Sequence, residues 1–215
     1  MKTIHPFRLK DFPGFSRKDL TRLEAYYRAQ LEGHAAPERR VGWNGPHSQQ
    51  VRFEALALVG DLRGRTILDV GCGLGAFWGY LKKKRVQADY TGVDLFPNVI
   101  AEARRHYPGA RFEARVLTAR PYRARSFDYA FLSGVFNVKV KDNWAYMRSL
   151  LKCVLKQTRK AVAFNVLNAE AGLKEKDRFT VRSEDLVSFG RKLDVSKVGL
   201  LDHYHPMDLT LFLYR

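Results

Sequence analysis

The sequence predicts an α/β fold, a doubly wound sheet of seven strands that is mostly parallel and ends in an antiparallel hairpin. From residue 66 onward, short apolar runs alternate with amphipathic stretches, which is typical of parallel strands joined by right-handed crossovers with helices on both faces. The last two apolar runs, "DVSKVGLL" and "DLTLFLYR", are separated only by "DHYHPMD". Because this is too little chain for a crossover helix, we expect these two runs to pair antiparallel.

Two helices are expected before the first strand. The apolar positions of the first are Leu20, Leu23, Tyr27 and Leu31, which recur at spacings of three and four. Ser16 and Asp19 form a capping pair at its start. The polar segment "EGHAAPERRVGWNGPH" is expected to be a loop, and Ser48 is expected to cap a second helix that runs to about Leu62.

The elements of the sheet follow in order. Strands are predicted at residues 66–70, 88–95, 110–117, 126–133 and 160–166, before the two strands of the hairpin. Helices are predicted at residues 76–84, 97–107 and 142–156. We therefore expect a domain over residues 48–215, preceded by an N-terminal helix and lid segment over residues 1–47.

Composition limits the class of protein. The chain has 215 residues, 46% of them hydrophobic, and no apolar run approaches the length that crosses a bilayer. The first residues, "MKTIHPFRLKDFPGF", carry charges and prolines where a secretory signal has its apolar core, so we expect a cytoplasmic protein without a membrane partner. Cys72 and Cys153 form no CxxC pair, which argues against a disulfide framework or a structural zinc.

The charge balance favours polyanions as partners. An excess of 38 Lys and Arg over 22 Asp and Glu gives a net charge of +16. Such a surface binds phosphates with release of counterions, which makes RNA or DNA a candidate partner. The basic runs are short and spread along the chain, however, so solvated faces explain them as well.

The stretch "TILDVGCGLGAF" carries the chemistry. Its glycines permit a tight turn from strand to helix and let the backbone approach a ligand closely. Asp94 ends the next strand, where a carboxylate accepts hydrogen bonds from the hydroxyls of a ribose. The two features predict a cofactor with an adenosine half. Gly71, Gly73 and Ala76 also satisfy the relaxed dinucleotide fingerprint, so these residues leave NAD open.

Asp69 ahead of the loop and Gly75 within it complete the pattern acid-x-Gly-x-Gly-x-Gly. With Asp94 and the terminal hairpin, the chain resembles the class I S-adenosylmethionine-dependent methyltransferases over roughly residues 48–215. It is most similar to an uncharacterised bacterial group with "VGW…SQ…RFE" before this motif, "SG-x-FN" after the fourth strand and a "DLTLFLYR"-like end. The resemblance implies a Rossmann-like sheet and S-adenosylmethionine as cofactor.

The resemblance also implies site residues. The glycine loop faces the methionine and ribose parts of the cofactor, Asp94 holds the ribose hydroxyls and Leu95 lies against the adenine. Many members have an acid after the third strand, where this chain has Val116, so backbone atoms near Val116 and Leu117 are expected to replace it. The residues expected to bind the cofactor are Asp69, Gly71, Cys72, Gly73, Gly75, Asp94, Leu95, Val116, Leu117, Ser133, Trp43 and Gln49.

The methyl acceptor is less well defined. By the same resemblance, "SGVFN" is expected to border the transferable methyl. It differs from the Asn/Asp-Pro-Pro-Tyr motif of nucleic-acid amine methyltransferases, which disfavours a base amine. A methyl sulfonium is already activated, so a general base is needed only for a protonated acceptor. The candidates for catalytic roles are Asn137, His47 and His205. The pair "HYH" has no third ligand nearby, so no metal site is expected.

Other segments are expected near the acceptor. The segment with Trp43, His47 and Gln49 is expected to form a lid, although Trp43 could equally anchor the N-terminal helix. The lysine-rich loop "LNAEAGLKEKDRF" is expected to form a substrate-facing flap, and Asn165 and Asn168 follow the fifth strand within reach of the site.

These observations predict a methyltransferase that acts on an unidentified, small-molecule acceptor. An RNA methyltransferase is the first alternative, favoured by the charge. An NAD-dependent oxidoreductase is the second, although no substrate domain or proton donor for the nicotinamide stands out. The sequence does not predict an oligomeric state.

Overall fold

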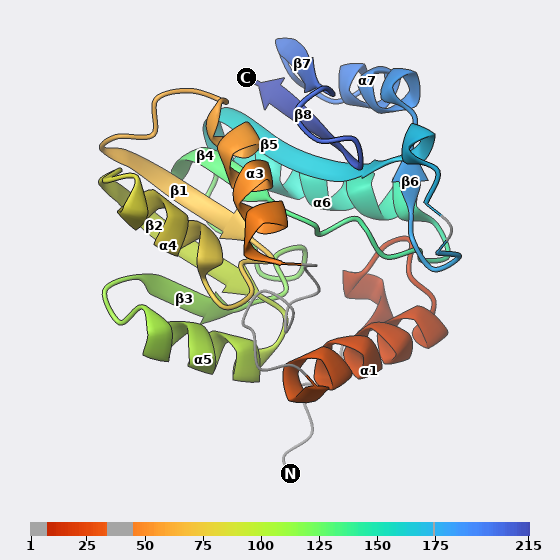
Figure 1. Ribbon diagram of the computed structural model, residues 1–215, viewed down its shortest axis with the longest axis horizontal. Coiled ribbons are helices and arrows are strands. Elements are labelled where there is room, and N and C mark those ends of the chain that lie inside the picture. The colour runs from red at the N-terminus through yellow and green to blue at the C-terminus, as the bar shows by residue number, and fades with distance from the viewer. Residues whose placement is uncertain (1–7, 34–44, 174) are drawn as a thin grey trace.

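A central sheet organises the computed structural model, which describes residues 8–33, 45–173 and 175–215. Its strand order is β3-β2-β1-β4-β5-β8-β7 (Figure 1). The strands are β1 (Arg65–Val70), β2 (Ala88–Asp94), β3 (Arg111–Ala114), β4 (Phe127–Leu132), β5 (Thr158–Asn168), β7 (Lys197–Leu201) and β8 (Asp208–Tyr214). β1 to β5 run parallel, whereas β8 is antiparallel to both β5 and β7. The predicted fold class and the terminal hairpin are confirmed.

Helices cover both faces of this sheet. One face carries α3 (Pro46–Ala57), α4 (Ala76–Lys83) and α5 (Pro97–His106), and the other carries α6 (Asn143–Gln157) and α7 (Ser183–Arg191). Phe77 and Leu81 bury one side of α4, and Met147 and Leu151 bury one side of α6. Such apolar burial is the main driving force of folding. Within the described residues no helix is both long and apolar enough to span a bilayer.

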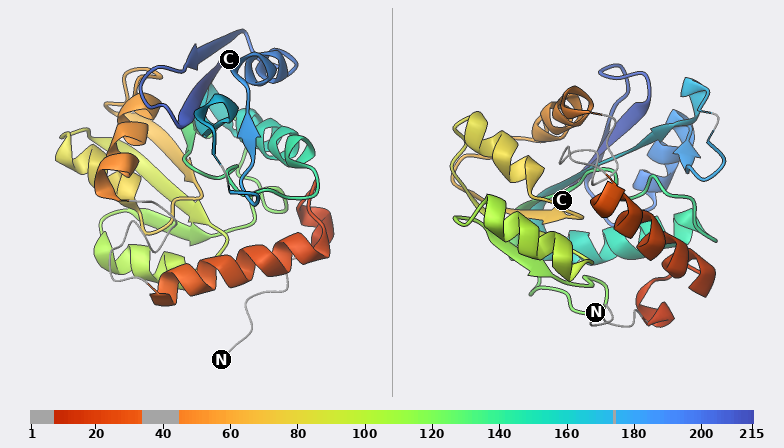
Figure 2. Two further views of the ribbon diagram at one scale, coloured as in Figure 1. Left: turned by 45° about the vertical axis from the view of Figure 1, so that its right-hand side comes forward. Right: turned by 60° about the horizontal axis from the view of Figure 1, so that its bottom comes forward.

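The N-terminal elements lie across the edge of the sheet where the parallel strands end. They are a short 3-10 helix, η1 (Leu9–Asp11), and α1 (Arg17–Gly33) (Figures 1 and 2). The predicted capping pair is confirmed: Ser16 N–H donates to Asp19 Oδ2 at 2.8 Å, and Asp19 N–H donates to Ser16 Oγ at 3.2 Å. Leu20 and Leu23 of α1 pack against Val140, which follows β4.

Some element boundaries and two short elements differ from expectation. α3 ends at Ala57 and does not continue to Leu62. α3 begins at Pro46 after Gly45, so Ser48 lies inside the first turn and does not cap the helix; proline at the first helical position sets this start. The two-residue strand β6 (Thr180–Val181), which pairs with β5, and α7 were not predicted. Their sequences are short, and the apolar residues of α7 are fixed by packing on β7 and β8 rather than by a long periodic pattern.

Candidate active site

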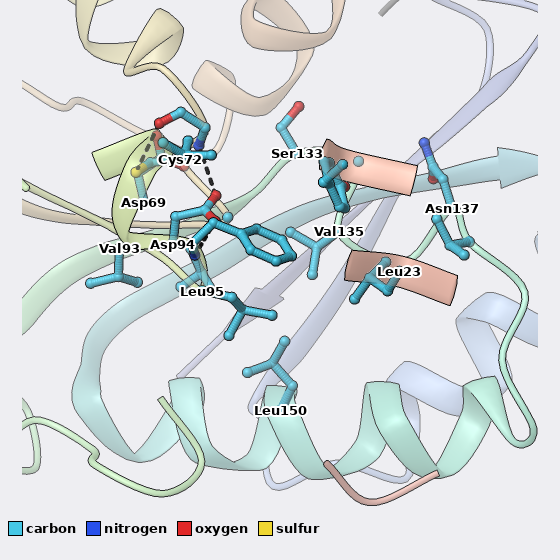
Figure 3. A pocket seen from close by; sticks show the side chains of 18 of the residues that line it. Leu23, Asp69, Cys72, Val93, Asp94, Leu95, Ser133, Val135, Asn137 and Leu150 are labelled. Carbon is cyan, nitrogen blue, oxygen red and sulfur yellow. Dashed lines mark hydrogen bonds between the residues drawn. The ribbon is translucent and has the colours of Figure 1, made fainter. Parts of the chain in front are cut away.

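A cavity of about 500 Å³ lies at the carboxyl ends of the parallel strands. The loops that follow β1, β2, β3 and β4 form its floor, and α1 and the turn before it, with Phe12 and Phe15, cover it from the N-terminal side. Figure 3 shows Asp94 and Leu95 on one side of this space and Asn137 on the other. Open α/β sheets bind ligands at this edge because the strand order reverses there, here between β1 and β4.

The glycine loop after β1 is held by the neighbouring strand. The N–H groups of Gly71 and Cys72 both donate to the carbonyl of Val93, at 2.8 and 3.0 Å. Gly71 and Gly73 have φ values of +71° and +53°, a region that side chains other than glycine rarely adopt. A Cβ at Gly71 would also come within 2.7 Å of Val135 Cγ2. The loop therefore needs glycine to bring its backbone to the cavity wall.

Asp94 ends β2 and presents its carboxylate to the cavity. Gly73 N–H donates to Oδ2 at 3.1 Å and Phe96 N–H donates to Oδ1 at 3.2 Å. Each oxygen accepts one of these bonds and retains acceptor capacity. Burial raises the pKa of Asp94, and the backbone N–H donors partly oppose that rise. The arrangement fixes a carboxylate whose remaining lone pairs can accept from two hydroxyl groups.

Asp69 lies beneath the loop, near the end of β1. Its side chain is 2% exposed and accepts a hydrogen bond of 2.6 Å from the hydroxyl of Tyr90. Burial raises the pKa of Asp69 to about 7, with the Tyr90 hydrogen bond opposing the shift. This carboxyl therefore connects β1 to β2 directly under the glycines.

Apolar side chains form the wall next to Asp94. Leu95, Val116 and Leu117 line it from the loops after β2 and β3, and Leu23 and Tyr27 line it from α1. β3 ends at Ala114, earlier than predicted, so Val116 and Leu117 lie in the following loop. The ring of Tyr27 lies 5.4 Å from that of Phe96. A flat apolar group fits such a wall.

The loop after β4 forms the opposite wall. The buried side chain of Asn165 in β5 accepts from Gly134 N–H at 2.7 Å and donates to Ser133 Oγ at 3.4 Å, which fixes the loop. Asn137 lines the cavity, and its Oδ1 is buried without a hydrogen-bond partner in the described part of the chain. A buried acceptor of this kind is suited to a donor on a ligand.

A polar cluster lies at a third position, between α3 and the β7–β8 hairpin. Arg52 forms an ion pair with the fully buried Asp208, and His205 Nδ1 lies 2.9 Å from Asp208 Oδ2. Arg52 and His205 both line the cavity. His203, in contrast, is 83% exposed and lies beside Asp202 on the surface.

The structure brings most of the predicted site residues together. Those that line the cavity are Asp69, Gly71, Cys72, Gly73, Asp94, Leu95, Val116, Leu117, Ser133, Asn137, Gln49 and His205. Gly75 instead caps α4 and packs against Phe112, and His47 is exposed on α3 and is not among the described lining residues. Trp43 lies outside the described residues.

Other lining residues were not predicted. Phe12, Phe15, Leu23 and Tyr26 reach the cavity from the N-terminal elements, and Arg52 reaches it from α3. The apolar spacing of α1 identified its buried face but gave no signal of what that face covers. Leu173 and Arg178 of the predicted flap also line the cavity, whereas Asn168 caps the following turn and donates to the carbonyl of Pro206.

Comparisons with known proteins agree with this geometry. Residues 67–158 match a family model described as a methyltransferase domain. The chain is 28% identical over 156 residues to Rv1506c of Mycobacterium tuberculosis, which carries the designation of a methyltransferase; the match covers 70% of this chain and 93% of that protein.

Two solved structures share the fold. Magnesium protoporphyrin IX methyltransferase from Synechocystis PCC 6803 with bound SAM has a TM-score of 0.64 at 15% identity, over 93% of this chain and 98% of that one. The DhpI complex with SAM and HEP has a TM-score of 0.66 at 20% identity, over 93% and 99%. With the glycine loop, Asp94 and the antiparallel end of the sheet in place, these matches support a class I S-adenosylmethionine-dependent methyltransferase.

Proposed function

We propose that the cavity binds S-adenosylmethionine beside Asp94 and that the enzyme methylates a small, largely apolar acceptor bound next to Ser133 and Asn137. One observation carries the proposal: a single cavity joins the glycine loop to the loop after β4, and aromatic residues of α1 and of the turn between η1 and α1 cover it. Its volume of about 500 Å³ falls within the range for sites that bury small molecules.

The residues present fit this cofactor. Asp94 would accept from the ribose hydroxyls, because its oxygens retain lone pairs after accepting from Gly73 and Phe96. Leu95, Val116 and Leu117 would hold the adenine, the first two half-buried and the third buried. Gly71 and Gly73 allow the close approach of the methionine part. Trp43 and Gln49 are proposed to contact the cofactor from the segment that precedes the sheet.

Bound S-adenosylmethionine supplies a methyl group on a positively charged sulfur, which needs no further activation. The chain's own residues then orient the acceptor and exclude water. Phe12, Phe15 and Leu23 shield the cavity from the N-terminal side, so the described residues 8–33 of the N-terminal segment (1–47) act as a cover for the domain over residues 48–215. Asn165 fixes the loop that carries Ser133 and Asn137.

Thermal stability tests the cofactor assignment. S-adenosylhomocysteine and S-adenosylmethionine are expected to raise the melting temperature, whereas NAD is not. Asp94→Ala is expected to lose hydrogen bonds to a charged group and to weaken binding of S-adenosylhomocysteine at least about tenfold. Asp89→Ala, on the exposed start of the same strand, serves as the control and should bind normally. Preferential stabilisation by NAD would support the oxidoreductase alternative instead.

Methyl transfer tests the acceptor. Radioactive S-adenosylmethionine is supplied with total RNA, total protein or a small-molecule extract in separate reactions. Label is expected in the small-molecule fraction. The net charge of +16 keeps RNA as the alternative, and label confined to RNA would contradict the proposal.

A further inference from the structure

The cavity has a buried ionic cluster that cofactor binding does not require. Arg52 of α3 is 6% exposed, and its partner Asp208, the first residue of β8, is fully buried. Arg52 also donates to the carbonyl of Ser48 at 2.6 Å. The attraction within a buried ion pair offsets the cost of desolvating the two charges only when the geometry is good. A gain in stability is therefore a weak explanation for such a pair. The pair lies against a third polar group.

That group is the imidazole of His205. Its Nδ1 lies 2.9 Å from Asp208 Oδ2, and in the structure Met207 N–H also points at Nδ1, as a donor at 3.2 Å. A ring nitrogen cannot donate to the carboxylate and accept from an N–H through the same position. A lone pair on Nδ1 would face the carboxylate oxygen and be repelled, so we place the proton on Nδ1. The lone pair of the neutral ring is then on Nε2.

His205 and the loop after β4 line the same cavity. Leu132 at the end of β4 is opposite Phe164 of β5, and Leu167 of β5 is opposite Asp208 of β8. β4 and β8 are therefore two strand spacings, about 10 Å, apart across the sheet, and these two positions are also offset by three residues along β5. Ser133, Asn137 and His205 all line the same cavity. An acceptor of modest size can lie between them.

We propose that His205 is the general base of the reaction and that the acceptor is a hydroxyl group on a largely apolar small molecule. This inference rests on the proposed function and assigns its substrate class. The hydroxyl proton moves to Nε2 of His205 as the oxygen forms a bond to the methyl carbon. The bond between methyl carbon and sulfur breaks, and its electron pair stays on sulfur. Asp208 is a positioning residue that stabilises the resulting imidazolium.

The chemistry of the wall favours a hydroxyl over a carboxylate. A carboxylate is already deprotonated at neutral pH and needs no base, whereas an alcohol or phenol does. A carboxylate would also lie near the buried charge of Asp208, whose nearest cation, Arg52, is already paired with it. Phe12, Phe15 and Leu23 offer apolar surface to the rest of such a molecule.

The charged groups around His205 keep it neutral. Burial lowers the pKa of His205, Arg52 and His47 of α3 lower it further, and Asp208 opposes them. Tyr204 is the neighbouring aromatic group, with its ring 6.5 Å from that of His205. A neutral imidazole at pH 7 can accept a proton, which is the state that a general base requires.

The test compares two histidines of one loop. Wild type, His205→Gln and His203→Gln are assayed for methyl transfer from radioactive S-adenosylmethionine into a small-molecule extract. His205→Gln is expected to lower the rate about 100-fold or more with an unchanged melting-temperature rise from S-adenosylhomocysteine. His203→Gln, at the 83% exposed position, is expected to match wild type. The labelled product is expected to survive mild alkali, as an ether does and an ester does not.

A second variant and a spectroscopic measurement guard against misfolding. Nitrogen NMR of the free wild-type protein is expected to show the proton of His205 on Nδ1. Asp208→Asn is expected to lower both the plateau rate and the midpoint of the pH–rate profile, because the carboxylate raises the pKa of His205. If Asp208 did not position His205, Asp208→Asn would leave the midpoint of the pH–rate profile unchanged.

The outcomes separate the two proposals. An active wild type with an equally active His205→Gln, an alkali-labile product, or a proton on Nε2 overturns the assignment of His205 and leaves the proposed function standing. If S-adenosylhomocysteine no longer raised the melting temperature of His205→Gln, His205 would be a cofactor ligand. That result would also overturn its assignment as general base. A wild type that labels no small molecule removes the acceptor part of the proposed function and this inference with it.

Discussion

The hydroxyl of Tyr90 donates a 2.6 Å hydrogen bond to the carboxyl of Asp69 beneath the glycine loop. Both side chains are almost fully buried, at 3% and 2% exposure. Burial raises the pKa of Asp69 from 3.8 to about 7, so the folded protein holds this proton more tightly than the unfolded chain does. The glycine loop therefore lies on a carboxyl that titrates near neutral pH.

The stability of the free protein should reflect this titration. Because the folded-state pKa is raised, the contribution of Asp69 to the free energy of unfolding is fully present below about pH 4 and is lost as pH rises through 7. The loss is at most about 4 kcal/mol. Asp69→Asn should remove that slope. Urea unfolding at pH 5 to 8 measures it, with Asp89→Asn at an exposed position of β2 as control. Identical slopes for wild type and Asp69→Asn would contradict the assignment.

The opposite pH dependence is expected at the other end of β1. Asp128 accepts from Arg159 Nε at 3.0 Å and from the N–H of Thr66 at 3.1 Å. Although burial acts to raise the pKa of Asp128, these donors lower it overall to about 2. Its contribution, about 2 kcal/mol, is present above pH 4 and lost as pH falls through 2.

Asp128→Asn should therefore destabilise the protein at pH 7 and make little difference near pH 2. Chemical denaturation across this range measures the change in the free energy of unfolding. Asp61→Asn is a suitable control, since the Asp61 side chain is 56% exposed beside Arg63. A loss of the same size at both pH values would show that packing, not charge, links Asp128 to its neighbours.

The sequence predicts the cofactor half of the site because its signals are local. The glycines, Asp69 and Asp94 lie on one strand, one turn and the next strand, so spacing alone places them at one edge of the sheet. Gly75 satisfies the same pattern, but its place in the fold is the start of α4, where it packs against Phe112.

The acceptor half depends on contacts between distant segments. Arg52 and Asp208 meet only because α3 lies over β5 and β8 follows β5 in the sheet. Leu23 reaches the cavity because α1 crosses the ends of the strands. Periodicity identifies the apolar face of a helix and leaves open what that face will cover. The sequence therefore predicts in detail the residues proposed to bind the methyl donor, and it gives only a set of candidates for those near the methyl acceptor.

The Asn165 amide should matter for turnover although it is buried away from the ligand. It accepts from Gly134 N–H at 2.7 Å, and its loss would leave that donor unpaired. Asn165→Ala is expected to cost about 1–3 kcal/mol of stability and to lower the rate constant more than the affinity for S-adenosylhomocysteine. Denaturation measures the stability, a methyl-transfer assay measures the rate constant, and isothermal titration measures the affinity. Thr210→Ala on the adjoining strand is the comparison, because its hydroxyl bonds to Tyr204 and not to the loop. An unchanged rate in Asn165→Ala would remove its positioning role.

Two glycines with nearly the same φ allow backbone strain to be separated from steric contact. Gly64 and Gly71 have φ values of +66° and +71°, but an added Cβ meets nothing within 4 Å at Gly64 and meets Val135 Cγ2 at 2.7 Å at Gly71. Gly64→Ala is expected to cost about 1–2 kcal/mol from strain alone. Gly71→Ala is expected to cost about 1–3 kcal/mol more, from the contact, and to weaken binding of S-adenosylhomocysteine.

Val135→Ala resolves the two contributions, because it removes the methyl group that the new Cβ would meet. Combined with Gly71→Ala, it should recover the contact part of the stability loss and leave the strain. Combined with Gly64→Ala, it should have the same effect as Val135→Ala alone, since distant sites add. Urea denaturation of wild type, the three single variants and the two double variants measures each difference in the free energy of unfolding. Equal recovery in both backgrounds would mean that Val135 does not limit the approach of the loop to the cavity.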